Sequence, residues 1–200
     1  MAEISAAQVK ALRDATGAGM MECKAALQEA NGDLEAATLI LRKRGLAQAA
    51  KKTGRATSEG LIGSYIHMGG KIGVLVELNC ESDFVARTDD FQNLLREISL
   101  QVAAANPQYV SRESVPAAII DREKSVYRGQ MENSGKPAPV IEKIIEGKLG
   151  SFYEQVCLVD QPSIREPKLT VGAMLQAAIA KLGENISVAR FIRFKIGESS

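Results

Sequence analysis

The chain has 200 residues, a formal net charge of +1, 46% hydrophobic residues and 24% charged residues, which is the balance of an ordinary soluble globular protein. A net charge near zero gives no global attraction to nucleic acid or acidic lipid, and no apolar run is long enough to span a bilayer. Three widely spaced cysteines and a single histidine argue against a disulfide framework and against a zinc site. With no signal peptide at the start, this cysteine usage predicts a cytoplasmic protein.

Residues 1–45 predict a compact bundle of three helices. Ser5 opens the first helix with a capping-box pattern. The second helix follows a glycine turn at residues 16–19, and Asp33 caps the third, which we expect to end at Gly45. A bundle of this size lies near the lower limit for an autonomous core, so it would gain from contact with a partner or with the rest of the chain.

Two methionines, Met20 and Met21, follow the glycine turn, and Arg13 lies near the same turn on the first helix. Exposed methionines would form a soft, adaptable contact patch, whereas buried methionines would close the small core. We expect one of each. Arg13 taken alone is typical of a solvated surface charge.

Residues 46–57 are expected to form a basic, partly helical linker between two domains. The basic residues in and just before this stretch are Arg42, Lys43, Arg44, Lys51, Lys52 and Arg55. A nucleic-acid surface is the alternative, and it would require steeply salt-dependent binding. No aromatic residue is interleaved with these charges, so the pattern favours a solvated linker.

The periodicity changes to that of strands after Glu59. Two strands, the second over residues 71–78, are joined by a turn at residues 68–70. His67 stands immediately before this turn, where a lone histidine is usually a surface residue or a hydrogen-bond donor. The alternating segment at residues 186–196 predicts a third strand of the same sheet.

Residues 80–91 connect the strongest strand signal to a clear helix over residues 90–105. Phe84 lies beside Asp83 in a tight acidic turn, and Thr88 or Asp89 caps the helix that follows. A large apolar ring on a connection between rigid elements is suited to enter another surface. The alternative is that Phe84 folds back onto the core of its own chain.

The carboxylates in this stretch, those of Glu81, Asp83, Asp89 and Asp90, could also be read as Mg²⁺ ligands. No general base, phosphate-binding loop or nucleophile motif accompanies them, and helix capping accounts for Asp89 and Asp90. The residues therefore favour a binding protein, with no metal site of its own, over an enzyme.

The overall order is three helices, two strands, several helices and one strand, which predicts an α+β fold. A break at residues 135–137 separates two helices of similar length, so we expect an antiparallel helical hairpin over about residues 115–153. The predicted core domain, residues 58–200, combines this hairpin with a three-stranded antiparallel sheet.

Two stretches resemble signatures of the translation elongation factor Ts family. Residues 16–27 (TGAGMMECKAAL) are similar to its N-terminal signature, and residues 80–86 (CESDFVA) to its second, with Ser82 where threonine is usual. Residues 65–77 and 183–186 match as well. The resemblance therefore covers essentially the whole chain, with its motifs in the same order.

This resemblance implies a guanine-nucleotide exchange factor for elongation factor Tu, without covalent chemistry and without a cofactor. The first three helices would form a ubiquitin-associated-like domain, and the hairpin resembles the family's coiled-coil element. Partner contacts near the Mg²⁺ site of the GTPase are implied for Ser82, Asp83, Phe84 and Val85. Further partner contacts are implied for Arg13, Met20, Met21 and His67.

A single core module resembles the short form of the family, which works as a homodimer and would give a 2:2 complex. Some short forms are thought to be joined by a cysteine in the terminal strand. Residues 190–193 contain no cysteine, so we expect a non-covalent dimer, and we expect neither nucleic acid nor membrane as a partner. A ubiquitin-like-protein adaptor is the alternative for the bundle alone, but it leaves Phe84 unexplained.

Overall fold

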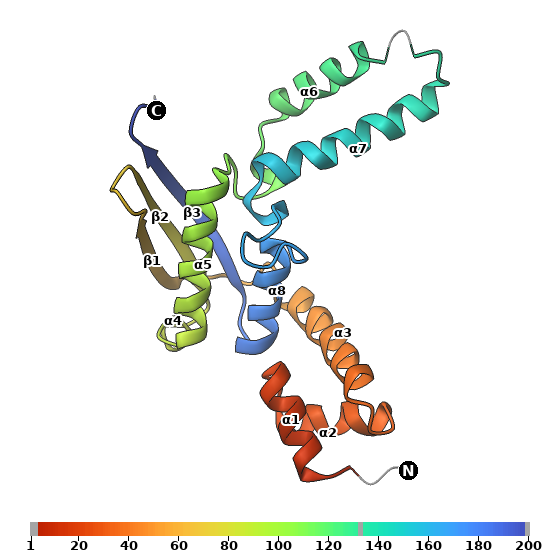
Figure 1. Cartoon of the computed structure of the whole chain (residues 1–200), viewed down its shortest axis with the longest axis vertical. Helices are drawn as coiled ribbons and strands as arrows, with labels where there is room; N and C mark the ends of the chain where they lie inside the picture. Colours follow the sequence, from red (N-terminus) through yellow and green to blue (C-terminus); the bar gives the residue numbers. More distant parts are fainter. Residues whose placement is uncertain (1–3, 132–133, 199–200) are drawn as a thin grey trace.

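The predicted α+β fold is confirmed by a computed structural model, which describes residues 4–131 and 134–198. Figure 1 shows a small sheet with helices on one side, a helical bundle at the N-terminus and a projecting helical hairpin. The helices and strands of the described residues are, in chain order, α1 (Ala6–Thr16), α2 (Met20–Glu29), α3 (Leu34–Lys52), β1 (Glu59–Ile66), β2 (Ile72–Cys80), α4 (Asp83–Ala86), α5 (Asp89–Ala105), α6 (Ala117–Gly129), α7 (Ala138–Val156), α8 (Val171–Leu182) and β3 (Ile186–Lys195).

The N-terminal bundle begins with the predicted capping box. The Ser5 hydroxyl accepts a hydrogen bond from the Gln8 backbone N–H at 3.2 Å, and the Gln8 side chain accepts one from the Ser5 N–H at 3.0 Å. Its small core is almost entirely aliphatic and consists of Val9, Leu12, Cys23, Ala26, Leu27, Ala37 and Leu41.

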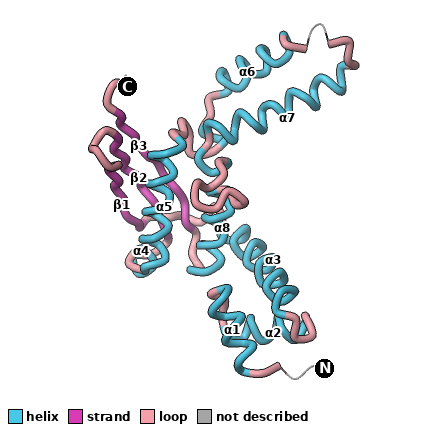
Figure 2. The backbone as a smooth tube through the Cα atoms, viewed as in Figure 1, coloured by secondary structure: helices cyan, strands magenta, loops and turns pink. Residues whose placement is uncertain are grey.

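The third helix does not end at Gly45, as the sequence predicted, but continues to Lys52. Residues 46–52 are mostly good helix formers, and α3 packs along α8 (Figure 2). A Cβ atom on Gly45 would lie 3.1 Å from the Ala180 side chain, and Ala49 is fully buried in the core of the sheet domain. Gly45 therefore allows α3 and α8 to approach closely. Only residues 53–57 of the expected linker, residues 46–57, lie outside helices and strands.

The sheet has the strand order β1-β2-β3, and both pairs are antiparallel. Alternate residues of β2, Val74, Val76, Leu78 and Cys80, are buried beneath helices α5 and α8. The largest fully buried side chain is Phe91 on α5. Because side chains alternate along a strand, the opposite face carries the intervening residues, and its exposed apolar members are Ile62, Ile66, Leu75, Ile192 and Phe194.

The predicted hairpin is formed by α6 and α7, which run antiparallel and project away from the sheet (Figure 1). Arg128 of α6 donates to Glu142 of α7 at 3.0 Å, and Lys148 lies 5.2 Å from the centre of the Tyr127 ring. In the described part of the chain, no helix is both long enough and apolar enough to cross a membrane.

Candidate functional site

The connection between β2 and α5 contains a single turn of helix, α4, flanked by short loops; we call residues 81–88 the Phe84 turn. The Thr88 hydroxyl accepts a hydrogen bond from the Phe91 N–H at 3.3 Å and so caps α5. This cap was one of the two that the sequence predicted. The Phe84 turn is thus anchored at both ends by rigid elements.

Phe84 points away from the core and is 79% exposed. Its neighbours hold the turn in place instead, because Ala86 is buried and Val85 packs against the main core. The alternative that Phe84 folds back onto the core is wrong for this chain. Because this aromatic ring is largely exposed on an anchored turn, it is available to contact the surface of another protein.

The carboxylates near Phe84 face different partners. Asp83 accepts a hydrogen bond from Arg87 at 2.6 Å, an exposed pair of little energetic weight. Glu81 accepts one from the backbone of Asn185 at 2.6 Å, and Asp90 pairs with Lys181 of α8 at 2.7 Å. Among the described residues, no group of three or more potential ligands is close enough to hold a metal ion.

A second turn, residues 183–185 between α8 and β3, lies directly against the Phe84 turn. The Glu184 carboxylate accepts two hydrogen bonds from Ser82, one from the backbone N–H at 2.9 Å and one from the hydroxyl at 2.6 Å. The Ser82 carbonyl in turn accepts a hydrogen bond from the Cys80 thiol at 3.0 Å. Burial, and then the negative charge of Glu184, raise the pKa of this thiol, so it remains a donor.

This contact was not anticipated from the sequence. Glu184 and Ser82 are 102 positions apart, and residues 183–186 carry no signal in the sequence beyond the family resemblance and a glutamate directly after a helix-ending glycine. This signal does not reveal which loop the glutamate contacts.

The two methionines at the start of α2 are both exposed, Met21 by 77% and Met20 by 50%. The expectation that one of them closes the bundle core is therefore wrong, because Cys23 and Leu27 of the same helix occupy that position. Arg13, in the last turn of α1, is also exposed. These three side chains flank the same glycine turn and give the bundle a mixed apolar and basic tip.

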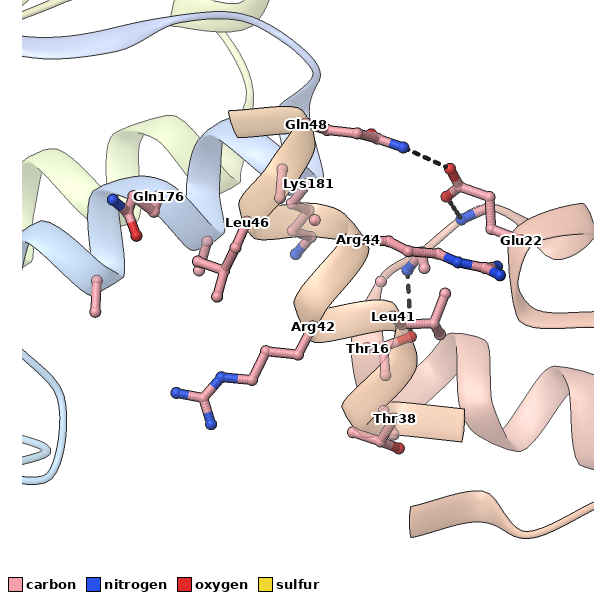
Figure 3. Close-up of a pocket in the computed structure, with 18 of the residues that line it drawn as sticks. Thr16, Glu22, Thr38, Leu41, Arg42, Arg44, Leu46, Gln48, Gln176 and Lys181 are labelled. Atoms are coloured by element: carbon pink, nitrogen blue, oxygen red, sulfur yellow. Dashed lines mark hydrogen bonds between the residues drawn. The ribbon is translucent and has the colours of Figure 1, made fainter. Parts of the chain in front are cut away.

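A cleft of about 440 Å³ lies behind this tip, between the bundle and α8. Figure 3 shows Glu22 and Gln48 at its edge, where they form a hydrogen bond of 3.4 Å, with Arg42 and Lys181 also among the residues that line it. Bundle and core therefore meet through α3 and leave an open space beside that helix.

His67 is exposed at the β1–β2 turn, and its ring nitrogen Nδ1 lies 3.0 Å from the Tyr65 hydroxyl. Its backbone N–H donates to the Ile72 carbonyl at 2.9 Å and closes the hairpin. This turn and the Phe84 turn lie at opposite ends of β2 (Figure 1). The predicted contact residues therefore form three separate surfaces rather than one pocket.

An α+β protein that exposes neighbouring apolar side chains on one sheet face and an aromatic ring on an anchored turn is suited to bind other proteins. Comparison with known sequences identifies the family. The family model described as Elongation factor TS matches residues 21–198, and the chain belongs to the elongation factor Ts family.

Curated relatives match over nearly the full length. The chain is 62% identical over 196 residues to Elongation factor Ts of Fervidobacterium nodosum, and the aligned region covers 98% of this chain and 100% of the relative. It is 56% identical over 199 residues to Elongation factor Ts of Solibacter usitatus, covering 100% of this chain and 94% of the relative. The protein of the same name from Koribacter versatilis is 60% identical over 195 residues, covering 98% and 89%.

Proposed function

We propose that this chain is a guanine-nucleotide exchange factor that binds elongation factor Tu in the cytoplasm and promotes release of GDP without covalent chemistry. The family supports the partner and the process. The single structural observation that carries the proposal is the 79% exposure of Phe84 on a turn that Val85 and Ala86 anchor to the core.

The mechanism follows from differential binding. An exchange factor binds the nucleotide-free GTPase more tightly than the GDP-bound form, and by reciprocity GDP weakens the grip of the factor. Phe84 inserts between helices of the GTPase, with Ser82, Asp83 and Val85 around it, and shifts the elements that hold Mg²⁺. Loss of the cation removes the charge that neutralises the phosphates of GDP. Because the ring is already exposed, its burial in the complex adds apolar area at little reorganisation cost.

Docking uses a second surface on the bundle. In this proposal the ubiquitin-associated-like bundle is a domain of its own, and Met20 and Met21 with Arg13 bind the nucleotide-binding domain of the GTPase. Methionine side chains adapt to irregular surfaces, and both are exposed here. His67, at the far end of the sheet, makes a further contact. Docking therefore sets the affinity, while insertion of Phe84 sets the rate of GDP release.

The active assembly in this proposal is a non-covalent homodimer that forms a 2:2 complex. The exposed apolar residues of the outer sheet face, Ile62, Ile66, Leu75, Ile192 and Phe194, support a second copy as the cover of this face. All three cysteines are free and buried, which supports a dimer without an intersubunit disulfide. Light scattering under reducing conditions should give twice the chain mass, and a monomer at micromolar concentration would contradict the dimer.

The proposal is tested by the affinity of the chain for purified elongation factor Tu with and without saturating GDP. We expect tighter binding to the nucleotide-free form, and equal affinities would overturn the exchange mechanism. A ubiquitin-like-protein adaptor, the alternative suggested by the bundle alone, predicts no binding to this GTPase in either state.

A further inference from the structure

The Phe84 turn contains too little local structure to fix its own orientation. Helix α4 has only four residues, and helix formation is costly until several turns are in place. Ser82, its N-cap residue, makes no side-chain capping bond, because its hydroxyl donates to Glu184 instead. The direction in which Phe84 points must therefore be set by contacts from outside the turn.

Val85 and Ala86 anchor the turn on the core, and residues 183–185 add polar contacts in which each turn accepts hydrogen bonds from the other. Glu184 accepts two hydrogen bonds from Ser82 at 2.9 and 2.6 Å, while Glu81 accepts the Asn185 backbone N–H at 2.6 Å. Each turn thus supplies a carboxylate to the other. Hydrogen bonds to ionised acceptors are about twice as strong as neutral ones, and Ser82 and Asn185 are at most partly exposed, which reduces competition from water.

The turn at residues 183–185 is itself held by the end of α3. Lys52 donates to the Gly183 carbonyl at 2.6 Å, and the Asn185 side chain donates to the Arg55 carbonyl at 2.8 Å. Because α3 also packs against α1 and α2 in the bundle, the same turn contacts a helix of the domain that carries the docking surface and the loop that carries Phe84.

We propose that Glu184 is a positioning residue that holds Phe84 in the orientation required for insertion. The inference rests on the proposed exchange function and adds to it a residue that need not touch the GTPase. Docking through the bundle does not require this orientation of Phe84, so the fraction of bound molecules that hold it sets the rate of the insertion step that follows. Loss of Glu184 should therefore lower the rate of GDP release at saturation and leave the half-saturating concentration, set by docking, nearly unchanged.

Three substitutions separate positioning from general support of the fold. Glu184→Ala removes both acceptor oxygens. Glu184→Gln keeps one acceptor for the Ser82 N–H and offers an amide donor to the Ser82 hydroxyl. Glu184→Asp keeps the charge but is one methylene too short to reach. Glu97→Ala is the matched control, since Glu97 of α5 also contacts a distant loop, through Arg165 at 3.7 Å, but lies away from the Phe84 turn.

The experiment measures release of fluorescent GDP from elongation factor Tu over a range of concentrations of the full chain. Hydrogen exchange of the Ser82 amide and thermal melting are recorded on the same samples. We expect the saturating rate to fall about tenfold in Glu184→Ala and similarly in Glu184→Asp, with most of it restored in Glu184→Gln. Glu97→Ala should resemble the parent chain. Protection of the Ser82 amide should follow the same order, with little change in Tm.

The inference is overturned if Glu184→Ala releases GDP at the parent rate, or if Glu184→Gln fails as badly as Glu184→Ala. It is also overturned if the loss appears only as a higher half-saturating concentration. Failure of the exchange function itself is distinguishable, because the parent chain would then not accelerate GDP release and Phe84→Ala would match it.

Discussion

Replacement of Phe84 by alanine should separate folding from exchange. Phe84 is 79% exposed, whereas Phe91, seven residues further on, is fully buried. Phe91→Ala is therefore a matched control that removes the same side chain from the neighbouring helix. The two substitutions have opposite expected effects, because one ring contributes to the core and the other contributes only in the complex.

The expected magnitudes follow from this difference in burial. An exposed substitution usually changes stability by no more than about 0.5 kcal/mol, whereas loss of a buried phenylalanine ring costs about 3–5 kcal/mol. For a chain of this length each kcal/mol moves Tm by about 2–4 °C. Phe84→Ala should therefore lower Tm by less than about 2 °C, and Phe91→Ala by about 6–20 °C.

In the exchange assay the order is reversed. A buried aromatic anchor contributes about 2 kcal/mol or more at an interface, which corresponds to roughly a thirtyfold loss in the rate of GDP release at a fixed subsaturating concentration. Folded Phe91→Ala should retain most of its activity below its own melting range. If Phe84→Ala melts far lower yet exchanges normally while folded, Phe84 is a core residue and the reasoning is refuted.

Three further predictions concern docking, pH dependence and assembly. Met20→Ala combined with Met21→Ala should raise the half-saturating concentration in the exchange assay while Tm changes little; equal losses of stability and affinity would place these side chains in the core. Burial raises the pKa of the Cys157 thiol from 9.0 to about 11, so the folded chain binds this proton more tightly than the unfolded chain. The protonated thiol contributes about 3 kcal/mol to the free energy of unfolding, and this contribution is complete below pH 9 and is lost as the pH rises through 11. Urea unfolding between pH 8 and pH 11 should therefore show a shallower fall in stability for Cys157→Ala than for the parent, and parallel curves would contradict the raised pKa. Phe194→Glu, on the outer sheet face, should give monomers by light scattering without loss of helix content by circular dichroism; an unchanged dimer would exclude this face as the interface.

Local signals in the sequence predicted much of the fold. The capping residues Ser5 and Thr88 start the helices that they were expected to start, and the alternation at residues 186–196 identified the third strand. The helix end at Gly45 was mispredicted because a glycine in a basic stretch usually signals a stop. Here its lack of a side chain lets α3 approach Ala180, and that contact is invisible without the tertiary structure.

The candidate site was predictable in identity but not in geometry. The residue type of Phe84 and its position in the turn mark it as a candidate contact. Its exposure depends on the anchoring of Val85 and Ala86 to the core. The sequence around Phe84 has no periodicity that distinguishes the exposed residue from the two anchored ones. The role inferred for Glu184 depends on which two turns meet across 102 positions. The chemical type of each side chain is known from the sequence. Which distant residues come into contact depends on how the sheet and α8 pack together.

The central claim, that this chain promotes nucleotide exchange, is tested most directly by release of labelled GDP from elongation factor Tu with and without the chain. We predict that the release rate rises with concentration of the chain to a plateau well above the spontaneous rate. A release rate that stays at the spontaneous value, in the presence of parent chain at concentrations that bind the GTPase, would contradict the claim.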